Sequence, residues 1–470
     1  MSARRLASLA AALAAAGLAA GCMSLAPEYQ RPNAPIAAAY PDDAGGGANR
    51  PAWDIEWPAF FGDERLRKLI GLALHNNRDL RAATAAIEQA RAQLQVRRAD
   101  VYPTVGVGAT AARQIGSNGE PATAYSAGLA LSTWELDFFG RLRSLNDAAL
   151  SQFYATEEAR KAAQVSLIAA VASTHLAIQA DDELLAATRE TLTTREDSYR
   201  LTKLKFDNGA ASELDLRQAE SLLEGARVTL AQVRRQRALD ENALALLLGQ
   251  PVPTDLPPAL PLAQQKLLAD IPAGLPSDLL DRRPDVRQAE RGLMAANANI
   301  GAARAAFFPR ITLTGLAGTA SGELSGLFKA GSWAWTGTGQ ALLTVFDAGR
   351  NTGNLQAANA ARDVALAQYE KAIQSAFREV ADALAGRATF GEQLRAQQAQ
   401  AAAEEVRAKL ADLRYRNGAA SYLDVLDAQR ALFAARQAVV QVQLAQAQNL
   451  VTVYKVLGGG WLEPAPLTKP

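Results

Sequence analysis

Apolar side chains occupy every second position in two stretches of the chain, one after Pro103 and one after Pro309. A period of two, with one apolar face and one small or polar face, is typical of the strands of a membrane β-barrel. The pattern therefore predicts two β-hairpins, over residues 101–137 and 309–347. A half-exposed sheet of a soluble protein is the alternative. The expected strands cover residues 105–111, 125–131, 311–317 and 333–345.

Helical patterns fill most of the remaining chain. Residues 140–206 and 349–415 contain no proline and carry apolar side chains at helical spacing. Each stretch predicts one helix, far longer than helices of ordinary globular domains. Further helices are expected before each hairpin, over 63–99 and 277–306, and a third helix after each long one. On the helices alone, a helical bundle or a dimeric coiled coil remains an alternative.

The turn after each long helix has a recognisable composition. An Asn-Gly pair accepts the left-handed backbone that ends a helix, and the Ser-x-x-Asp sequence that follows forms a capping box in its Asp variant. We assign these aspartates to capping rather than to a pore, and we expect each turn to be the tip of a helical hairpin. The residues are Asn208, Gly209, Ser212 and Asp215, and then Asn417, Gly418, Ser421 and Asp424.

These similarities reflect an internal tandem duplication. FDNGAASELDL at 206–216 is repeated as YRNGAASYLDV at 415–425, and the helix before each hairpin is also repeated. The repeated unit is a whole domain rather than a short solenoid repeat. The expected organisation is a signal peptide at 1–21, a tether at 22–61, a first copy at 62–249 with its tip at 207–212, a Pro-rich linker at 250–276, a second copy at 277–458 with its tip at 416–421, and a C-terminal tail at 459–470.

The N-terminus is typical of an export signal. Two arginines precede an apolar stretch over residues 6–21, which ends at Cys22. LAAGC resembles the bacterial lipoprotein signal and predicts a covalent lipid on Cys22, although Ala19 replaces the usual Leu. Met23, rather than Asp, favours the outer membrane. An ordinary secretory signal with an incidental cysteine is the alternative.

Composition and charge exclude several classes of function. The 49 Lys and Arg residues balance 48 Asp and Glu residues without a basic block, so nucleic-acid binding is not expected. Cys22 is the only cysteine, which excludes an intrachain disulfide and a multi-cysteine metal site. His75 and His175 have no counterparts in the other copy, and no phosphate-binding or dinucleotide-binding loop is present. We therefore expect no enzyme activity, no metal and no cofactor other than the lipid.

Two hairpins are too few to cross a membrane alone. Open sheet edges cannot face hydrocarbon, because each unsatisfied backbone group there costs several kcal/mol. The smallest bacterial barrels use about eight strands. Several chains must therefore pool their strands. Because about eight strands enclose only side chains, an open duct favours three chains or more.

Cys22, the segment LAPEYQRP at 25–32, the two hairpins and the paired NGAAS tips together resemble the TolC-like outer-membrane efflux protein family. More narrowly, the chain resembles the lipidated channels of resistance-nodulation-division multidrug pumps. The resemblance implies an α+β membrane protein: a homotrimer whose β-barrel of twelve strands, four from each chain, lies in outer-membrane lipid and continues into a long periplasmic α-helical barrel.

The same resemblance implies a passive exit channel of a tripartite efflux pump for drugs or other toxic compounds. Its partners would be an inner-membrane resistance-nodulation-division transporter and a periplasmic adaptor, the latter engaging the NGAAS tips. A TolC-like duct for secreted proteins or peptides is one alternative. A structural lipoprotein coiled coil without a channel is another.

The segment YLDVLDAQR at 422–430 matches the family sequence Tyr-Leu-x-x-Leu-Asp-Ala-Gln-Arg. By that match, Leu423 would form an apolar constriction, Asp427 an acidic ring, and Arg430 the partner that helps to hold the periplasmic gate shut. Leu423 and Asp427 are four residues apart and share a helix face. A ring of carboxylates in a narrow bore favours cations.

The first copy departs from this sequence. It keeps the leucine as Leu214 but has Gln218 and Ser221 in place of the acid and the base, so gating charge would come from the second copy alone. From the residues themselves, Asp427 and Arg430 can also be an ordinary surface pair of about a few tenths of a kcal/mol.

Overall fold

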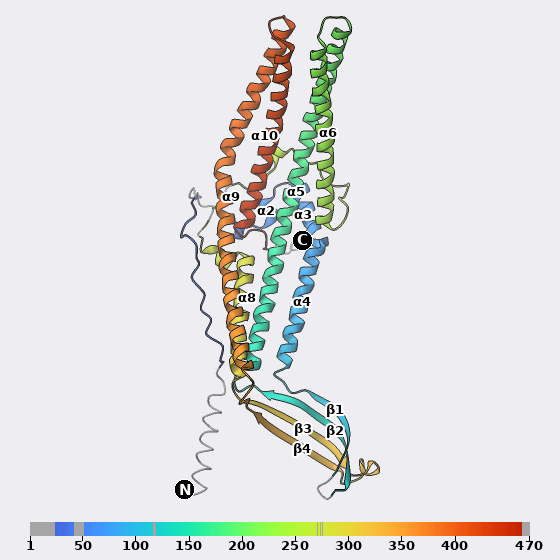
Figure 1. The fold of residues 1–470 in the computed structure, drawn as a ribbon, viewed down its shortest axis with the longest axis vertical. Coiled ribbons are helices and arrows are strands. Elements are labelled where there is room, and N and C mark those ends of the chain that lie inside the picture. Colours follow the sequence, from blue (N-terminus) through green and yellow to red (C-terminus); the bar gives the residue numbers. More distant parts are fainter. Residues whose placement is uncertain are drawn as a thin grey trace, which may run out of the picture. The chain divides into compact units, whose positions relative to one another are not determined.

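The computed structural model describes residues 24–41, 51–115, 119–269, 271, 272, 274 and 276–462 (Figure 1). The signal peptide, Cys22 and the end of the predicted tail lie outside these residues. The helices are η1 (Ala52–Asp54), α2 (Trp57–Phe60), α3 (Glu64–Asn76), α4 (Arg78–Ala99), α5 (Arg141–Asp207), α6 (Glu213–Leu248), η2 (Leu262–Gln264), α7 (Asp278–Arg282), α8 (Pro284–Ala305), η3 (Leu324–Gly326), α9 (Arg350–Arg416) and α10 (Tyr422–Val456). The strands are β1 (Val105–Ile115), β2 (Pro121–Leu136), β3 (Arg310–Ser321) and β4 (Trp333–Leu342).

The chain forms two compact units, and each contains parts of both sequence copies. The first holds the sheet, η3, most of α4 and of α8, and the beginnings of α5 and α9. The second holds the rest of the long helices, the tips, α3, α6, α7, α10 and the linker. The first unit comprises residues 1–33, 85–158 and 287–372, and the second comprises 34–84, 159–286 and 373–470.

The first unit contains an antiparallel sheet of four strands in the order β1-β2-β3-β4. Val107 pairs with Leu129, Leu129 with Ala317, and Ala317 with Trp335, so one apolar row crosses all four strands. Val107 is 86% exposed and Trp335 is 73% exposed. The predicted alternation is therefore present, and it leaves large apolar side chains without cover in the single chain.

A bulge keeps this face apolar along its length. The register of β2 against β3 shifts between Leu131 and Trp134. Because side chains alternate strictly along a strand, the shift returns Trp134 to the face of Leu131. The last strand, predicted to reach residue 345, ends at Leu342 because pairing with β3 stops at Arg310.

The opposite face is lined by small residues where β2 and β3 approach closely. A Cβ atom at Gly128 would meet the backbone of Ala317 and Gly318, and one at Gly318 would meet that of Ala127 and Gly128. Glycine is therefore required at both positions, which the alternating pattern alone did not indicate.

Both long helices agree with their predicted bounds to within one residue. An aspartate that precedes each of them accepts backbone N–H groups of the first turn. Asp137 accepts from Arg143 at 2.7 Å, and Asp347 accepts from Asn351 at 2.9 Å. A carboxylate at this place satisfies N–H groups that have no partner inside the helix. This second use of aspartate caps was not predicted.

The helix before each hairpin was predicted to be continuous, and that prediction was wrong. α3 ends at Asn76, and the side chain of the next residue, Asn77, accepts from the Leu80 N–H at 2.9 Å and so begins α4. α7 ends before Arg283, since the proline that follows disfavours helical backbone at the preceding residue. Both breaks lie at matching positions of the two copies.

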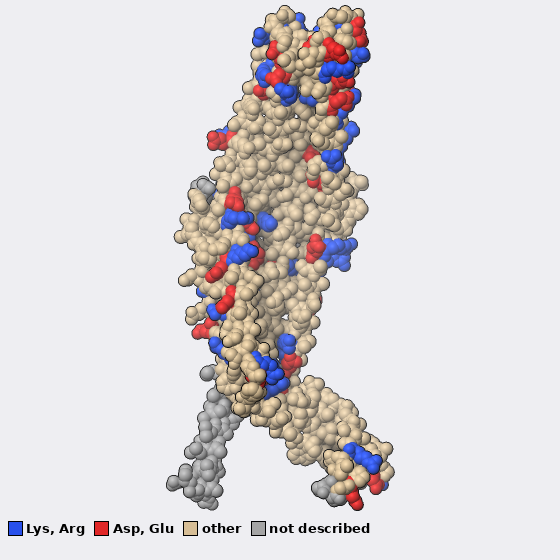
Figure 2. All heavy atoms as spheres, in the orientation of Figure 1, with Lys and Arg blue, Asp and Glu red and all other residues tan. Residues whose placement is uncertain are grey.

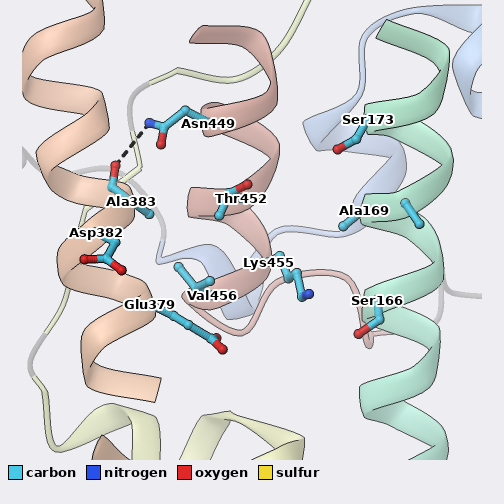
Figure 3. A pocket seen from close by; sticks show the side chains of 11 residues that line it. Ser166, Ala169, Ser173, Glu379, Asp382, Ala383, Asn449, Thr452, Lys455 and Val456 are labelled. Carbon is cyan, nitrogen blue, oxygen red and sulfur yellow. Dashed lines mark hydrogen bonds between the residues drawn. The ribbon is translucent and has the colours of Figure 1, made fainter. Parts of the chain in front are cut away.

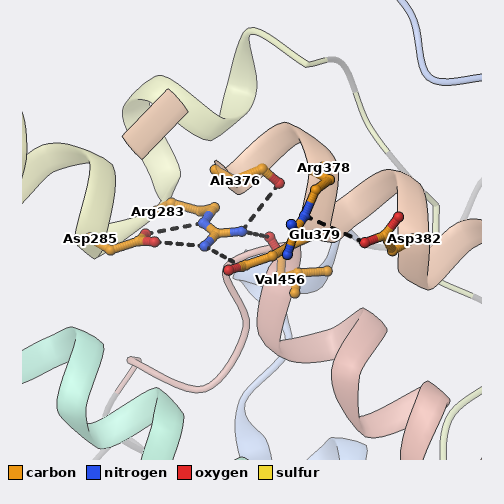
Figure 4. Close-up of polar contacts among 7 residues, drawn as sticks. All are labelled: Arg283, Asp285, Ala376, Arg378, Glu379, Asp382 and Val456. Carbon is orange, nitrogen blue, oxygen red and sulfur yellow. Dashed lines mark hydrogen bonds and ion pairs between the residues drawn. The ribbon is translucent and has the colours of Figure 1, made fainter. Parts of the chain in front are cut away.

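The side chains at the two breaks hold matching carbonyl groups. Asn77 donates to the carbonyl oxygen of Leu247 at 2.9 Å, and Arg283 donates to that of Val456 at 3.3 Å (Figure 4). Arg283 also forms ion pairs with Asp285 at 2.6 Å and Glu379 at 2.8 Å. The second copy thus replaces one amide contact with a charged network that includes α9.

The core of the second unit joins the segment before α3 to the end of α10. The Phe60 and Tyr454 rings stack with centroids 4.1 Å apart, and the Tyr454 hydroxyl donates to the carbonyl oxygen of Ile55 at 2.6 Å. Burial raises the pKa of Tyr454. The apolar side chains Leu66, Leu69 and Ile70 of α3, in the same unit, are also fully buried.

His175 belongs to this core rather than to a catalytic site. Its Nε2 lies 3.4 Å from Oδ2 of Asp63, and both side chains are buried. Oδ1 of Asp63 accepts from the Arg65 N–H at 2.9 Å and caps α3. Burial raises the pKa of Asp63, but the hydrogen bonds outweigh it and leave that pKa below its usual value. Among the described residues, no group of three His, Cys, Asp or Glu side chains could hold a metal ion.

One described helix, α5, is long and apolar enough to cross a membrane by length and composition. Over half of its most apolar window, 56%, is buried inside the molecule, as in the core helix of a folded domain. This burial gives α5 a packing role that accounts for its composition.

Candidate functional site at the helical tips

Each tip is built by the capping box predicted from the sequence. The Asp215 N–H donates to Oγ of Ser212 at 3.1 Å, and the Ser212 N–H donates to Oδ2 of Asp215 at 3.1 Å. The Ser421 and Asp424 pair repeats this arrangement, at 3.3 Å and 3.0 Å. Both aspartates are therefore occupied in starting α6 and α10.

The Asn-Gly pairs end the long helices as expected. Gly209 and Gly418 both have φ of +71°, where glycine has no steric penalty. The Asn208 and Asn417 side chains donate to carbonyl groups of the last helical turn at 2.7 Å and 2.8 Å. The two tips are also linked to each other, because Lys205 donates to the Tyr415 hydroxyl at 2.9 Å.

Asp427 lies between two guanidinium groups. Arg430 of the same helix donates to Oδ1 at 2.5 Å, as the sequence match suggested. Arg407 of α9 donates to Oδ2, also at 2.5 Å, and it bonds Glu404 at 3.1 Å. Hydrogen bonds from Arg407 and then Arg430 hold the pKa of Asp427 below its usual value.

Arg407 was missed in the sequence because it belongs to no motif and lies on the preceding helix. Its position could have been found by folding the two helices antiparallel about the tip. Together with Asp427, it joins α9 to α10 just behind the turn. Figure 2 shows that Lys, Arg, Asp and Glu side chains gather around the tips, whereas the sheet is largely free of them except near its loops.

The structure brings the predicted gate residues against their first-copy counterparts. Leu423 is 57% exposed. It borders a cavity of about 230 Å³ between α6 and α10. The cavity is lined by Gln218, Ser221, Leu222, Leu423, Leu426, Asp427 and Arg430. The two copies therefore meet here through unlike side chains.

A larger cavity of about 520 Å³, with both polar and apolar side chains in its lining, lies between α5, α9 and α10 of the second unit (Figure 3). Lys455 and Glu379 line it, and Asn449 at its rim donates to the Ala383 carbonyl oxygen at 3.1 Å. Glu379 is already paired with Arg283. The side chains lie on separate helix faces and do not converge on one point, so they form no catalytic arrangement.

The segment that follows Cys22 is held along α8 in the first unit. Arg304 donates to the Leu25 carbonyl oxygen at 3.2 Å, and Asn297 donates to that of Pro27 at 2.7 Å. Arg31 forms an ion pair with the buried Glu290 at 2.7 Å. The described chain therefore begins beside the end of α8 that leads into β3.

An open amphipathic sheet with two long helical hairpins defines a subunit of an outer-membrane channel with a helical extension. The chain belongs to the outer membrane efflux protein family, which matches residues 69–250 and 275–459. The α+β fold class predicted from the sequence is thereby confirmed.

Relatives in this family have similar lengths. The chain is 45% identical over 457 residues to the toluene efflux pump outer membrane protein TtgC of Pseudomonas putida, covering 94% of this chain and 93% of the relative. It is 44% identical over 450 residues to the outer membrane protein OprJ of Pseudomonas aeruginosa, covering 94% of each.

Solved structures agree with the fold. A membrane protein from Pseudomonas aeruginosa superposes with a TM-score of 0.86 at 43% identity, covering 95% of this chain and all of the other, 100%. The open state of the Neisseria gonorrhoeae MtrE outer membrane channel gives a TM-score of 0.85 at 39% identity, covering 93% and 99%. The predicted outer-membrane location is confirmed by this family membership.

Proposed function

We propose that three copies of this chain form a passive exit duct that carries small toxic compounds across the outer membrane. The observation that carries the proposal is the open sheet, whose β1 and β4 have no partner on their outer edges among the described strands. Unpaired backbone groups are not tolerated in hydrocarbon. Three chains would close the edges into a barrel of about twelve strands, which is wide enough for a lumen.

The two faces of the sheet support this assembly. The apolar row through Val107, Leu129 and Trp335 suits contact with lipid, and the glycine-rich face with Gly128 and Gly318 suits a lumen. Tyr125 and Trp333 lie near the loop end of this sheet and Trp134 near its other end, as two aromatic girdles would require.

We assign the exported compounds from those that the names of the relatives specify. Their names specify toluene, solvents and antibiotics, and this chain would carry similar small apolar compounds. The duct has no energy source of its own, so an inner-membrane resistance-nodulation-division transporter would drive export. A periplasmic adaptor would contact the tips, and a lipid on Cys22 would add membrane affinity near the sheet.

We assign the gate to the tips because residues 422–430 match the family sequence given above. Leu423 would narrow the bore, and Asp427 would be held by Arg430 and Arg407 in the closed state. An opening motion that separates α9 from α10 would break the bond between Arg407 and Asp427, so we assign this contact to the closed state.

Deletion of the gene in its own host tests the function, with the full chain restored on a plasmid as control. We expect lower tolerance of toluene and apolar antibiotics, unchanged titres of exported proteins, and channel currents from the purified protein in planar bilayers. Unchanged tolerance together with the absence of current would refute the proposal. Loss of exported protein with normal drug tolerance would favour a secretion duct.

A further inference from the structure

A cavity of about 380 Å³ lies in the second unit, between α5 on one side and α9 and α10 on the other. Its volume falls in the range of small-molecule sites. Arg195 of α5 lines it and is only 6% exposed. The guanidinium group lies 5.2 Å from the centre of the Phe433 ring, and Nη1 donates to the carbonyl oxygen of Leu222 at 2.8 Å.

The carboxylates that line this cavity already have cationic partners. Arg195 is in none of these pairs, and no ion pair joins it to a carboxylate in the part of the chain that the structure describes. Its Nε has no hydrogen-bond partner there either. The pairs are Glu190 with Arg436 at 3.3 Å, Glu405 with Lys409 at 2.9 Å, and Asp412 with Arg416 at 2.8 Å.

A buried cation without a counter-ion is unfavourable, because it loses hydration that nothing replaces. Burial accordingly lowers the pKa of Arg195. The Phe433 ring and one carbonyl group offset part of this cost. An anion placed in the cavity would supply the missing charge, and its apolar part could contact Phe433 and Leu432.

The second copy has no equivalent site. The position that matches Arg195 there is Glu404, which is bonded to Arg407. The buried arginine is therefore present in one copy only, and duplication alone does not explain it, although both copies contribute to the lining of the cavity.

We propose that this cavity binds a small organic carboxylate, with Arg195 as its counter-ion and Phe433 against its apolar part. The site is independent of the proposed export function, since binding needs neither a partner pump nor an open channel. It predicts that the protein distinguishes an aromatic acid from its uncharged analogue of similar size.

The test uses the purified full-length protein in detergent with 4-fluorobenzoate as the probe, followed by fluorine NMR line broadening. We expect saturable binding of 4-fluorobenzoate and at least tenfold weaker binding of 4-fluorobenzyl alcohol. Arg195→Met, which keeps the apolar stem, should weaken binding of the acid at least tenfold, and Arg195→Lys should retain part of it. Arg200→Met is the matched control, because Arg200 lies on the same helix, is 82% exposed and pairs with Asp197.

Equal binding of the acid and the alcohol by the unaltered protein would overturn the proposal without any variant. Equal binding of the acid by Arg195→Met and Arg200→Met would do the same. Gel mobility of the unheated assembly and far-ultraviolet circular dichroism show whether each variant is folded. If Arg195→Met does not fold, the comparison of 4-fluorobenzoate with 4-fluorobenzyl alcohol on the unaltered protein still tests the proposal.

Discussion

Replacing Arg283 with Met should destabilise the second unit far more than replacing a neighbouring exposed arginine. The side chain of Arg283 is 7% exposed, and it joins Asp285, Glu379 and two backbone carbonyl groups (Figure 4). Removing one partner of a buried ion pair costs about 3–5 kcal/mol. Because both carboxylates are more than two-fifths exposed, solvent would compensate them in part, and we expect about 3 kcal/mol.

Arg378→Met is the matched control. Arg378 lies on α9 beside the same network, but its side chain is 78% exposed and it pairs with Asp382 at 3.6 Å. An exposed pair of this kind contributes about 0–1 kcal/mol. Denaturant unfolding of the purified protein, followed by circular dichroism, should therefore separate the two variants clearly.

A double variant sharpens the test. Glu379→Gln removes a carboxylate that Arg283→Met leaves without its partner, so the double variant should be less unstable than the sum of the two single changes. If Arg283→Met unfolds at the same denaturant concentration as Arg378→Met, the reasoning from burial is wrong. Strict additivity would show that the Arg283 to Glu379 pair contributes nothing of its own.

Three further predictions concern the gate, the pH response and the sheet. Asp427→Ala and Arg407→Ala should each raise single-channel conductance in planar bilayers, and a normal conductance for Arg407→Ala would remove it from the gate. Burial is the main cause that raises the pKa of Asp181 from 3.8 to about 7, and the hydrogen bond with Asp240 and the negative charge of Asp240 add to it. Since the unfolded chain ionises first, stability should fall as pH rises from about 4 to about 7; Asp181→Asn should flatten this profile in denaturant titrations, and parallel profiles would contradict the assignment. Gly128→Val should prevent assembly of the trimer, because its side chain would meet the backbone of β3. Gels of unheated and heated protein would then lack a heat-sensitive trimer band, and a normal trimer band would show that the sheet can shift.

Much of the fold could be predicted because local patterns determine it. Alternation gave the strands, the absence of proline gave the long helices, and the Asn-Gly and Ser-x-x-Asp sequences gave both tips. The break at Asn77 escaped prediction because asparagine is tolerated within helices and only its contact with Leu247 reveals the cap. The break at Arg283 could have been predicted from the proline that follows.

The residues of the candidate site also differ in how far the sequence could predict them. Asp427 and Arg430 lie in one helical turn, so a sequence match could pair them. Arg407 and Arg195 depend on which helix faces which, and that packing is set by contacts distant in the sequence. Single-sequence patterns carry little information on such contacts.

Duplication and divergence together give the proposed trimer an uneven inner rim. Six homologous helix starts would surround the bore, but only alternate ones carry an acid and a base, while the others present an amide and a hydroxyl. Such an opening would attract ions at the three helix starts that carry charged residues, and the three helix starts between them would be neutral. A molecule leaving the periplasm would therefore meet a threefold electrostatic field rather than a uniform ring.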